Sequence, residues 1–194
     1  MKHLLVAINA KYIHTCLAVR YLKGYVKQCS SLDVDFLEFT INQQSAYLLE
    51  EIYRQAPDTL AFSCYIWNIG VVTSLLPDLR KVLPQTKIIL GGPEVSFGSS
   101  TLLSTLPDAD YILAGEGEIG YLALLEALES GTQLNDVPNL IWRSCQGIRQ
   151  NAAAPFLSMD ELPFPYENLE QLSHQILYYE GCRGCPFDCQ YCLS

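Results

Sequence analysis

Short apolar runs alternate with amphipathic stretches through the first two thirds of the chain, and this alternation restricts the fold more than any other feature. The runs are rich in Leu, Ile, Val and Phe, as expected of strands that are buried on both faces of a sheet. Five β-α units in sequence indicate a parallel sheet that helices cover on both sides. The predicted fold class is therefore α/β, doubly wound and flavodoxin-like. Strands are predicted at 3–8, 34–39, 59–64, 87–90 and 111–114.

The segments between these runs carry apolar residues at helical spacing. The hydroxyl of Ser45 is expected to cap the second helix, which should bury Tyr53. Pro77 is expected to kink the third helix or to begin a fresh first turn, and Gly131 is placed to end the last one. Helices are predicted at 15–28, from Ser45 onward, around 72–83, at 100–106 and at 118–130.

The pattern changes after residue 134. Residues 140–143 and 147–149 flank a short polar turn and predict a small hairpin. Residues 151–175 contain three prolines and no sustained periodicity, which indicates an ordered linker over the first domain. Residues 175–179 are predicted to be the first strand of a second, incomplete domain. The expected organisation is a domain at 1–134, a hairpin and linker at 135–174, and the start of another domain at 175–194.

Composition favours a folded protein and excludes several partners. Hydrophobic residues make up 49% of the 194 residues and charged residues 17%, which is incompatible with a disordered chain. The net charge of −9 and the lack of a Lys/Arg cluster argue against a nucleic-acid surface. The apolar run at 4–8 is too short for a signal peptide, and no stretch reaches the roughly 18 apolar residues of a membrane span. We therefore expect a soluble, cytoplasmic protein with reduced thiols.

Four of the eight cysteines lie between residues 182 and 192. Cys185, Cys189 and Cys192 have the spacing C-x3-C-x2-C. Three thiolates on one loop can hold three irons of a cubane cluster and leave the fourth iron open, whereas clusters that only carry electrons have four cysteine ligands. Cys182 would close that fourth position, so a small buried thiol beside the cluster is the preferred interpretation. A zinc site is a weaker alternative because zinc pairs usually stand a dozen or more residues apart, and a disulfide knot needs an oxidising compartment.

This segment, including Tyr191 before the last cysteine, resembles the cluster motif of the radical S-adenosylmethionine (SAM) enzymes. The resemblance implies a [4Fe–4S] cluster on Cys185, Cys189 and Cys192, with SAM chelated to the open iron. It also implies reductive cleavage of SAM to a 5′-deoxyadenosyl radical. An external electron donor such as flavodoxin or ferredoxin would reduce the cluster.

A ligand on the first domain is expected beside the carboxyl ends of the strands, where the order 2-1-3-4-5 reverses. This rule brings the loops 9–14, 63–68 and 91–97 around one crevice. Gly91 and Gly92 remove two side chains in succession, so that a bulky group can lie against the backbone. Ser63 offers a hydroxyl, and Tyr65 and Trp67 offer flat apolar surface.

These loops resemble the cobalamin-binding domains of methionine-synthase type. Ser63-Cys64-Tyr65 and Gly91-Gly92 match the second and third motifs of that family, while Asn9-Ala10-Lys11 stands where its Asp-x-His would be. The histidine that ligates cobalt is therefore missing, although His14 lies nearby. The segments 91–94, 115–118 and 157–165 resemble radical SAM enzymes with an N-terminal cobalamin domain. The candidate cofactor-binding residues are Asn9, Lys11, His14, Ser63, Tyr65, Trp67, Gly91, Gly92, Pro93, Glu94, Gly115 and Gly117.

The sequence also offers two weaker interpretations of this domain. Residues 115–120 satisfy the dinucleotide fingerprint G-x-G-x-x-G, but they follow the fifth strand, and Glu116 and Glu118 would face the pyrophosphate. A phospho-receiver domain needs acids where Asn9 and Ser63 stand.

The expected function is that of the N-terminal part of a cobalamin-dependent radical SAM enzyme. The resemblance implies methyl transfer or cyclisation on a small or unknown substrate, and this chain alone is expected to bind cobalamin without catalysis. A non-catalytic cobalamin carrier or sensor with a zinc-binding cysteine cluster, and a flavin-binding flavodoxin-like protein, are the alternatives.

Overall fold

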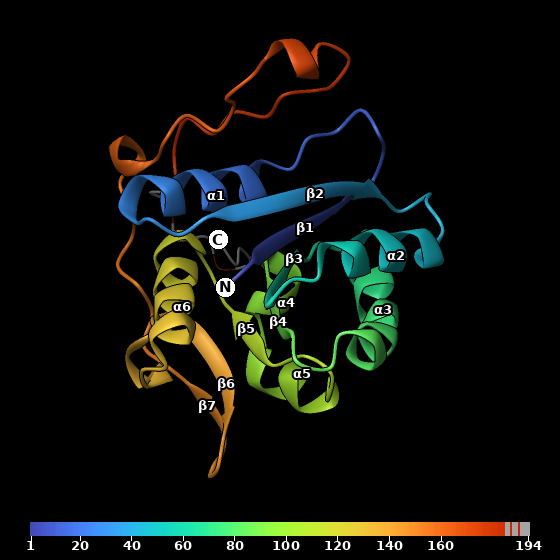
Figure 1. Cartoon of the computed structure of the whole chain (residues 1–194). Helices are drawn as coiled ribbons and strands as arrows, with labels where there is room; N and C mark the ends of the chain where they lie inside the picture. The colour runs from blue at the N-terminus through green and yellow to red at the C-terminus, as the bar shows by residue number, and fades with distance from the viewer. Residues whose placement is uncertain (185–186, 188–189, 191–194) are drawn as a thin grey trace.

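The structure is a computed structural model that describes residues 1–184, 187 and 190. Its centre is a seven-stranded sheet of order β2-β1-β3-β4-β5-β6-β7 (Figure 1). The first five strands are parallel, which confirms the predicted doubly wound order. The strands are β1 (His3–Asn9), β2 (Val34–Thr40), β3 (Thr59–Ser63), β4 (Lys87–Gly91), β5 (Tyr111–Leu113), β6 (Leu140–Ser144) and β7 (Gly147–Gln150).

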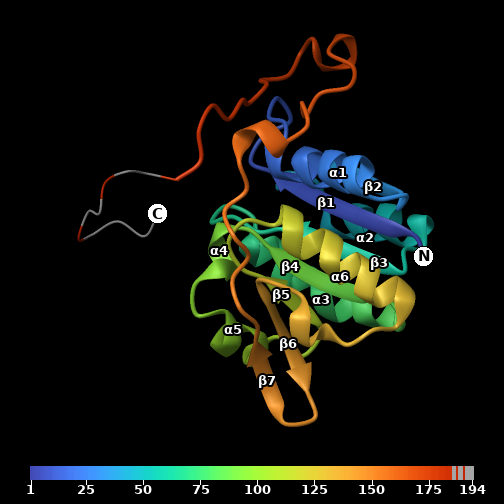
Figure 2. The ribbon, with the colours of Figure 1, turned by 90° about the vertical axis from the view of Figure 1, so that its left-hand side faces the viewer.

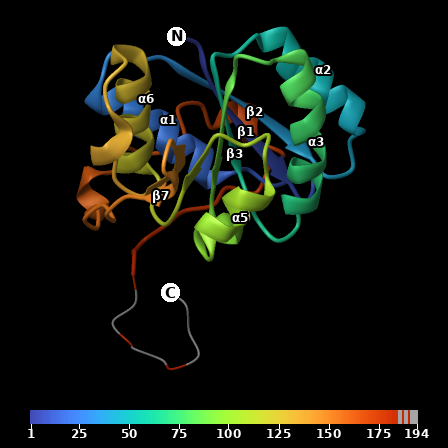
Figure 3. The ribbon, with the colours of Figure 1, turned by 90° about the horizontal axis from the view of Figure 1, so that it is seen from below.

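Helices cover both faces of the sheet (Figure 3). On one face α1 and α6 pack over Leu5 and Ala61, and on the other α2, α3 and α5 pack over Leu4 and Leu60. Successive strand residues point to opposite faces, which explains why these strands are apolar throughout. The α-helices are α1 (Leu17–Cys29), α2 (Ser45–Gln55), α3 (Ile69–Val82), α4 (Pro93–Ser96), α5 (Ser99–Thr105) and α6 (Glu118–Ser130). Short 3-10 turns are formed by Leu134–Asp136, Met159–Glu161 and Glu170–Leu172.

Several helix details differ from the sequence prediction. The cap position of α2 is Gln44, and Ser45 is already the first helical residue, so its hydroxyl makes no cap hydrogen bond. Tyr53 was expected to be buried but is 54% exposed, because α2 meets the sheet through Leu48 and Ile52. The third helix runs without interruption through Pro77.

The predicted hairpin forms as β6 and β7, and it continues the sheet. Strand β6 pairs antiparallel with β5, with Tyr111 opposite Trp142. Residues 151–175 then rise from β7 past the carboxyl ends of the parallel strands (Figure 2). Leu157 and Tyr166 of this segment are buried, in agreement with an ordered linker that packs on the first domain.

The strand predicted at 175–179 does not form in this structure. This segment is extended but forms a single bridge, between His14 and Ile176. A strand needs a continuous hydrogen-bonded neighbour, and within the described residues the β1–α1 loop supplies one bridge. None of the helices in the part of the chain described here is long and apolar enough to cross a membrane.

Candidate functional site

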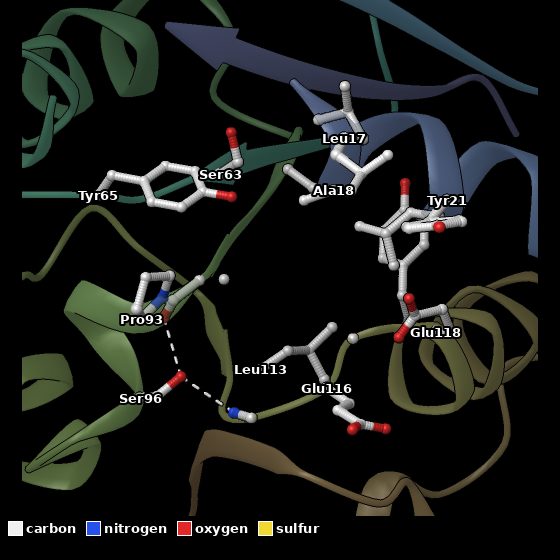
Figure 4. A pocket seen from close by; sticks show the side chains of 18 of the residues that line it. Leu17, Ala18, Tyr21, Ser63, Tyr65, Pro93, Ser96, Leu113, Glu116 and Glu118 are labelled. Carbon is white, nitrogen blue, oxygen red and sulfur yellow. Dashed lines mark hydrogen bonds between the residues drawn. The ribbon is translucent and has the colours of Figure 1, made fainter. Parts of the chain in front are cut away.

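A cavity of ≈ 910 Å³ lies between the sheet and helices α1 and α6, toward the carboxyl ends of the parallel strands (Figure 4). Its floor is formed by Leu5, Ala61 and Ile89, which are neighbours in register on β1, β3 and β4. The small side chain of Ala61 between two larger ones leaves room above the middle of the sheet. The base of the cavity is therefore apolar.

The walls come from both sides of the sheet edge. Figure 4 shows Leu17, Ala18 and Tyr21 of α1 across an open space from Tyr65 and Pro93. Sequence analysis did not identify the α1 residues, because they follow an ordinary amphipathic pattern. These residues lie in the first turns of α1, next to the end of a strand, and this position is the one signal in the sequence that could have predicted them as site residues.

Ser63 ends β3 and places its hydroxyl at the cavity, 3.6 Å from the sulfur of Cys16. Burial raises the pKa of the Cys16 thiol and raises that of Cys64 to about 12. Both thiols are therefore protonated at neutral pH. Ser63 thus presents an uncharged hydrogen-bonding group to a ligand on an otherwise apolar wall.

The two glycines after β4 differ in what they do. A Cβ at Gly91 would meet no atom closer than the carbonyl oxygen of Leu113 at 3.7 Å, whereas a Cβ at Gly92 would lie 2.6 Å from the carbonyl oxygen of Cys64. Gly92 also has a φ of +107°. Gly92 is therefore required by the backbone itself, and Gly91 leaves space that a ligand can use.

The loop before α6 forms the lower wall. The hydroxyl of Ser96 donates to the carbonyl oxygen of Gly92 (2.8 Å) and accepts from the amide of Gly115 (3.0 Å), as Figure 4 shows. Glu118 is buried at the start of α6, and its carboxylate accepts a hydrogen bond of 2.6 Å from Arg183. Burial opposes the charge of Arg183, but hydrogen bonds and ion pairs with Glu118 and Glu180 raise its pKa above the usual arginine value.

The β1–α1 loop is occupied by other contacts. The amide nitrogen of the Asn9 side chain donates to the carbonyl of His14 (2.9 Å), and Nδ1 of His14 lies 2.5 Å from the hydroxyl of Tyr178. Lys11 is exposed. The candidate residues that line the cavity are Ser63, Tyr65, Gly91, Gly92, Pro93, Gly115 and Gly117, and those outside its lining are Asn9, Lys11, His14, Trp67 and Glu94.

The predicted cluster ligands Cys185, Cys189 and Cys192, like Tyr191, lie outside the described residues. Cys182 was expected to be buried but is exposed, and it lines the cavity. Across 1–184, 187 and 190, no three His, Cys, Asp or Glu side chains gather closely enough to hold a metal ion. Arg183 was not predicted as a site residue, since nothing in the sequence indicated that it would reach Glu118.

A profile of the B12 binding domain matches residues 4–125, more than half of the chain. The cobalamin-dependent radical SAM methyltransferase TokK of Streptomyces tokunonensis is 24% identical over 172 residues, which cover 77% of this chain and 24% of that protein. The anaerobic magnesium-protoporphyrin IX monomethyl ester cyclase of Synechocystis is 31% identical over 129 residues, 63% of this chain and 26% of that protein.

The fold is also found in the cobalamin-dependent S-adenosylmethionine radical enzyme OxsB with aqua-cobalamin and S-adenosylmethionine bound. The TM-score is 0.73 at 17% identity, over 89% of this chain and 25% of OxsB. The chain thus spans about a quarter of the length of each of these proteins. The likeness to TokK and to the cyclase is one of amino-acid sequence and not only of sheet topology.

Proposed function

The chain belongs to the B12-binding domain family, and from this membership we propose that its cavity holds cobalamin within a cobalamin-dependent radical SAM enzyme. The observation that carries the proposal is the cavity of ≈ 910 Å³ at the carboxyl ends of the strands. Ligands of open α/β sheets bind at this edge.

The residues of the cavity suit cobalamin. The apolar floor of Leu5, Ala61 and Ile89 would accept a flat, poorly hydrated part of the cofactor. The hydroxyl of Ser63 would hydrogen-bond a polar atom on it. Gly91 lines the cavity and has no side chain, so it would let the cofactor approach the backbone of β4. These three features support the proposal that the cavity holds part of the cofactor.

The cobalt is expected to have no imidazole ligand from this domain. Asn9-Ala10-Lys11 supplies none, and His14 contacts Tyr178 instead of lining the cavity. The electron paramagnetic resonance spectrum of the cob(II)alamin form should therefore lack nitrogen coupling from a protein histidine, in wild type and in His14→Ala alike. Nitrogen coupling that disappears in His14→Ala would contradict this assignment.

The second part of the proposal concerns Cys185, Cys189 and Cys192. Their spacing supports a [4Fe–4S] cluster with one open iron. The likeness to the radical SAM methyltransferase TokK and to OxsB, a radical enzyme with S-adenosylmethionine bound, supports SAM as its ligand. When bound, the cluster and SAM would supply a carbon-centred radical. Cobalamin would supply a transferable methyl group or act as a redox partner. An external donor such as flavodoxin or ferredoxin would provide the electron. Methyl transfer and cyclisation are the reaction classes that the relatives represent.

Metal analysis after anaerobic reconstitution tests this part. We expect about four irons per chain and a broad absorbance near 400 nm, as for a [4Fe–4S] protein. Replacing Cys185, Cys189 and Cys192 by alanine should abolish iron binding and leave hydroxocobalamin binding intact. Stoichiometric zinc without iron would instead identify a cobalamin carrier, and bound yellow flavin would refute the cobalamin assignment.

A further inference from the structure

Residues 176–184, here called the strap, cross the mouth of the cavity. The strap leaves the loop above α1 and runs toward the carboxyl-end side of the sheet (Figure 2). It has no regular secondary structure, so specific contacts must fix its course. Its residues that line the cavity are Tyr178, Tyr179, Glu180, Cys182, Arg183 and Gly184.

The first end of the strap is fastened to the β1–α1 loop and to the linker. The amide of Ile176 donates to the carbonyl of Ile13 (2.6 Å), and the hydroxyl of Thr15 donates to the carbonyl of Ile176 (2.9 Å). The buried hydroxyl of Tyr166 accepts from the amide of Tyr178 (2.8 Å) and donates to its carbonyl (2.6 Å). These hydrogen bonds pair the backbone N–H and C=O groups of Ile176 and Tyr178, which do not belong to the sheet.

The other end is fastened by one side chain. The guanidinium of Arg183 lies 2.6 Å from Glu118, 3.0 Å from Glu180 and 3.6 Å from Glu116, and it packs over the ring of Tyr21 at 5.5 Å. The side chains of Arg183 and Glu118 are 13% and 6% exposed. Removing one member of a buried pair leaves the other charge uncompensated, which is strongly unfavourable. Glu118 therefore favours the position of the strap in which Arg183 is docked.

Another ion pair of the chain shows the contrast. Lys27 and Glu167 lie 2.7 Å apart, but their side chains are 69% and 70% exposed. Exposed pairs of this kind contribute little to stability, because water solvates and screens each charge. Lys27 also joins two segments far apart in sequence, the helix α1 and the linker. It is therefore a matched control for Arg183.

We propose that Arg183 is a positioning residue that, by pairing with buried Glu118, holds the strap over the cavity as the outer wall of the cofactor site. The inference rests on the proposed function for the identity of the cofactor. The same ion pair would thus retain the cobalamin in the cavity.

The test compares Arg183→Met, Glu118→Gln and the control Lys27→Met in the whole chain. Tyr179 is 74% exposed and gives chymotrypsin a site within the strap. We expect cleavage at Tyr179 to accelerate at least about tenfold in Arg183→Met and in Glu118→Gln, because losing about 1.4 kcal/mol of stabilisation of the docked strap gives a tenfold change. Cleavage should not accelerate in Lys27→Met. Dissociation of hydroxocobalamin should accelerate by a similar factor. The double variant Arg183→Met/Glu118→Gln should match the Arg183→Met single variant.

The outcomes separate the two proposals. Unchanged cleavage at Tyr179 in Arg183→Met overturns the role of Arg183, and so does faster cleavage with unchanged hydroxocobalamin dissociation. If Arg183→Met fails to fold, as judged by circular dichroism, the nearly isosteric Glu118→Gln decides by the same two measurements. A wild-type chain that binds no hydroxocobalamin defeats the proposed function instead, while the cleavage rates still report on the fastening of the strap.

Discussion

The indole ring of Trp67 stacks on the ring of Tyr65, with ring centroids 4.5 Å apart and an interplanar angle of 5°. The indole nitrogen donates to the carbonyl of Ile8 at the end of β1 (3.2 Å), which fixes the orientation of the stack. Tyr65 lines the cavity, and Trp67 does not. Trp67 therefore supports a wall of the cavity from behind, and burial raises the pKa of the Tyr65 hydroxyl, so this wall is uncharged.

This arrangement predicts an indirect effect of Trp67 on cobalamin affinity. Aromatic stacking contributes about 0.5–1.5 kcal/mol, so Trp67→Ala should weaken hydroxocobalamin binding by about two- to tenfold. Tyr65→Ala should weaken binding at least as much, and the double variant should match Tyr65→Ala. Absorbance titration measures all three. A larger loss in Trp67→Ala than in Tyr65→Ala would mean that the indole contacts the cofactor itself.

The adjacent glycines Gly91 and Gly92 predict opposite phenotypes. Gly91→Ala should leave the midpoint of thermal unfolding nearly unchanged, and Gly91→Leu should fold but bind hydroxocobalamin at least about tenfold more weakly, because the side chain enters the cavity. Gly92→Ala should lower stability by about 1–3 kcal/mol or more from backbone strain alone, with a clash at the Cys64 carbonyl in addition. Circular dichroism and absorbance titration separate the two effects, and a fully stable Gly92→Ala would contradict the interpretation.

The sequence predicts the core of this fold well for a physical reason. Leu4 and Leu5 are adjacent, yet they belong to separate clusters on the two faces of the sheet, and only a central strand needs both to be apolar. The pairing of Tyr111 with Trp142 could not be predicted, because it joins strands of opposite direction across a helix. Periodicity identifies an element and its faces, but not a distant neighbour at the sheet edge.

The candidate site divides in the same way. Ser63 and Gly91 are the last residues of the buried strands β3 and β4. The topology alone therefore brings them to one edge of the sheet. Glu118 and Arg183 are 65 residues apart, and their pairing depends on the course of a segment without regular structure. His14 was placed near the cavity by its loop, but the contact that it makes is with Tyr178. Loop direction and irregular segments carry no periodic signal in the sequence.

Arg80 joins the end of α3 to the two loops that precede β4 and β5, at the amino-terminal edge of the sheet. Its guanidinium donates to the carbonyls of Thr86 (2.9 Å) and Asp108 (2.9 Å) and to the carboxylate of Asp110 (2.7 Å). A lysine cannot reproduce this planar set of donors, so Arg80→Lys should lower the free energy of unfolding by about 1–3 kcal/mol. Urea titration measures the loss. Lys81→Met is the neighbouring control and should have no effect, because Lys81 and its partner Asp78 are exposed.

His3 predicts a pH dependence of stability. Its ring is buried against Thr59, at 2.9 Å, and burial lowers its pKa below the ordinary value of 6.5. The unfolded chain therefore binds a proton more readily than the folded chain. The stabilisation is fully present above about pH 6.5 and is lost as the pH falls through the lower folded value.

The measurement is the free energy of unfolding in urea at several pH values, for wild type and for His3→Asn, which does not titrate. As the pH falls below about 6.5, the free energy of unfolding of wild type should decrease relative to that of His3→Asn. The decrease should be about 1.4 kcal/mol for each unit by which burial lowers the pKa of His3. Glu129 lies 3.3 Å from the ring, but its pKa is lowered from 4.5 by the N-terminal ammonium. It therefore titrates below this window. If the free energies of unfolding of the two proteins depend on pH in the same way, burial does not lower the pKa of His3, which contradicts this prediction.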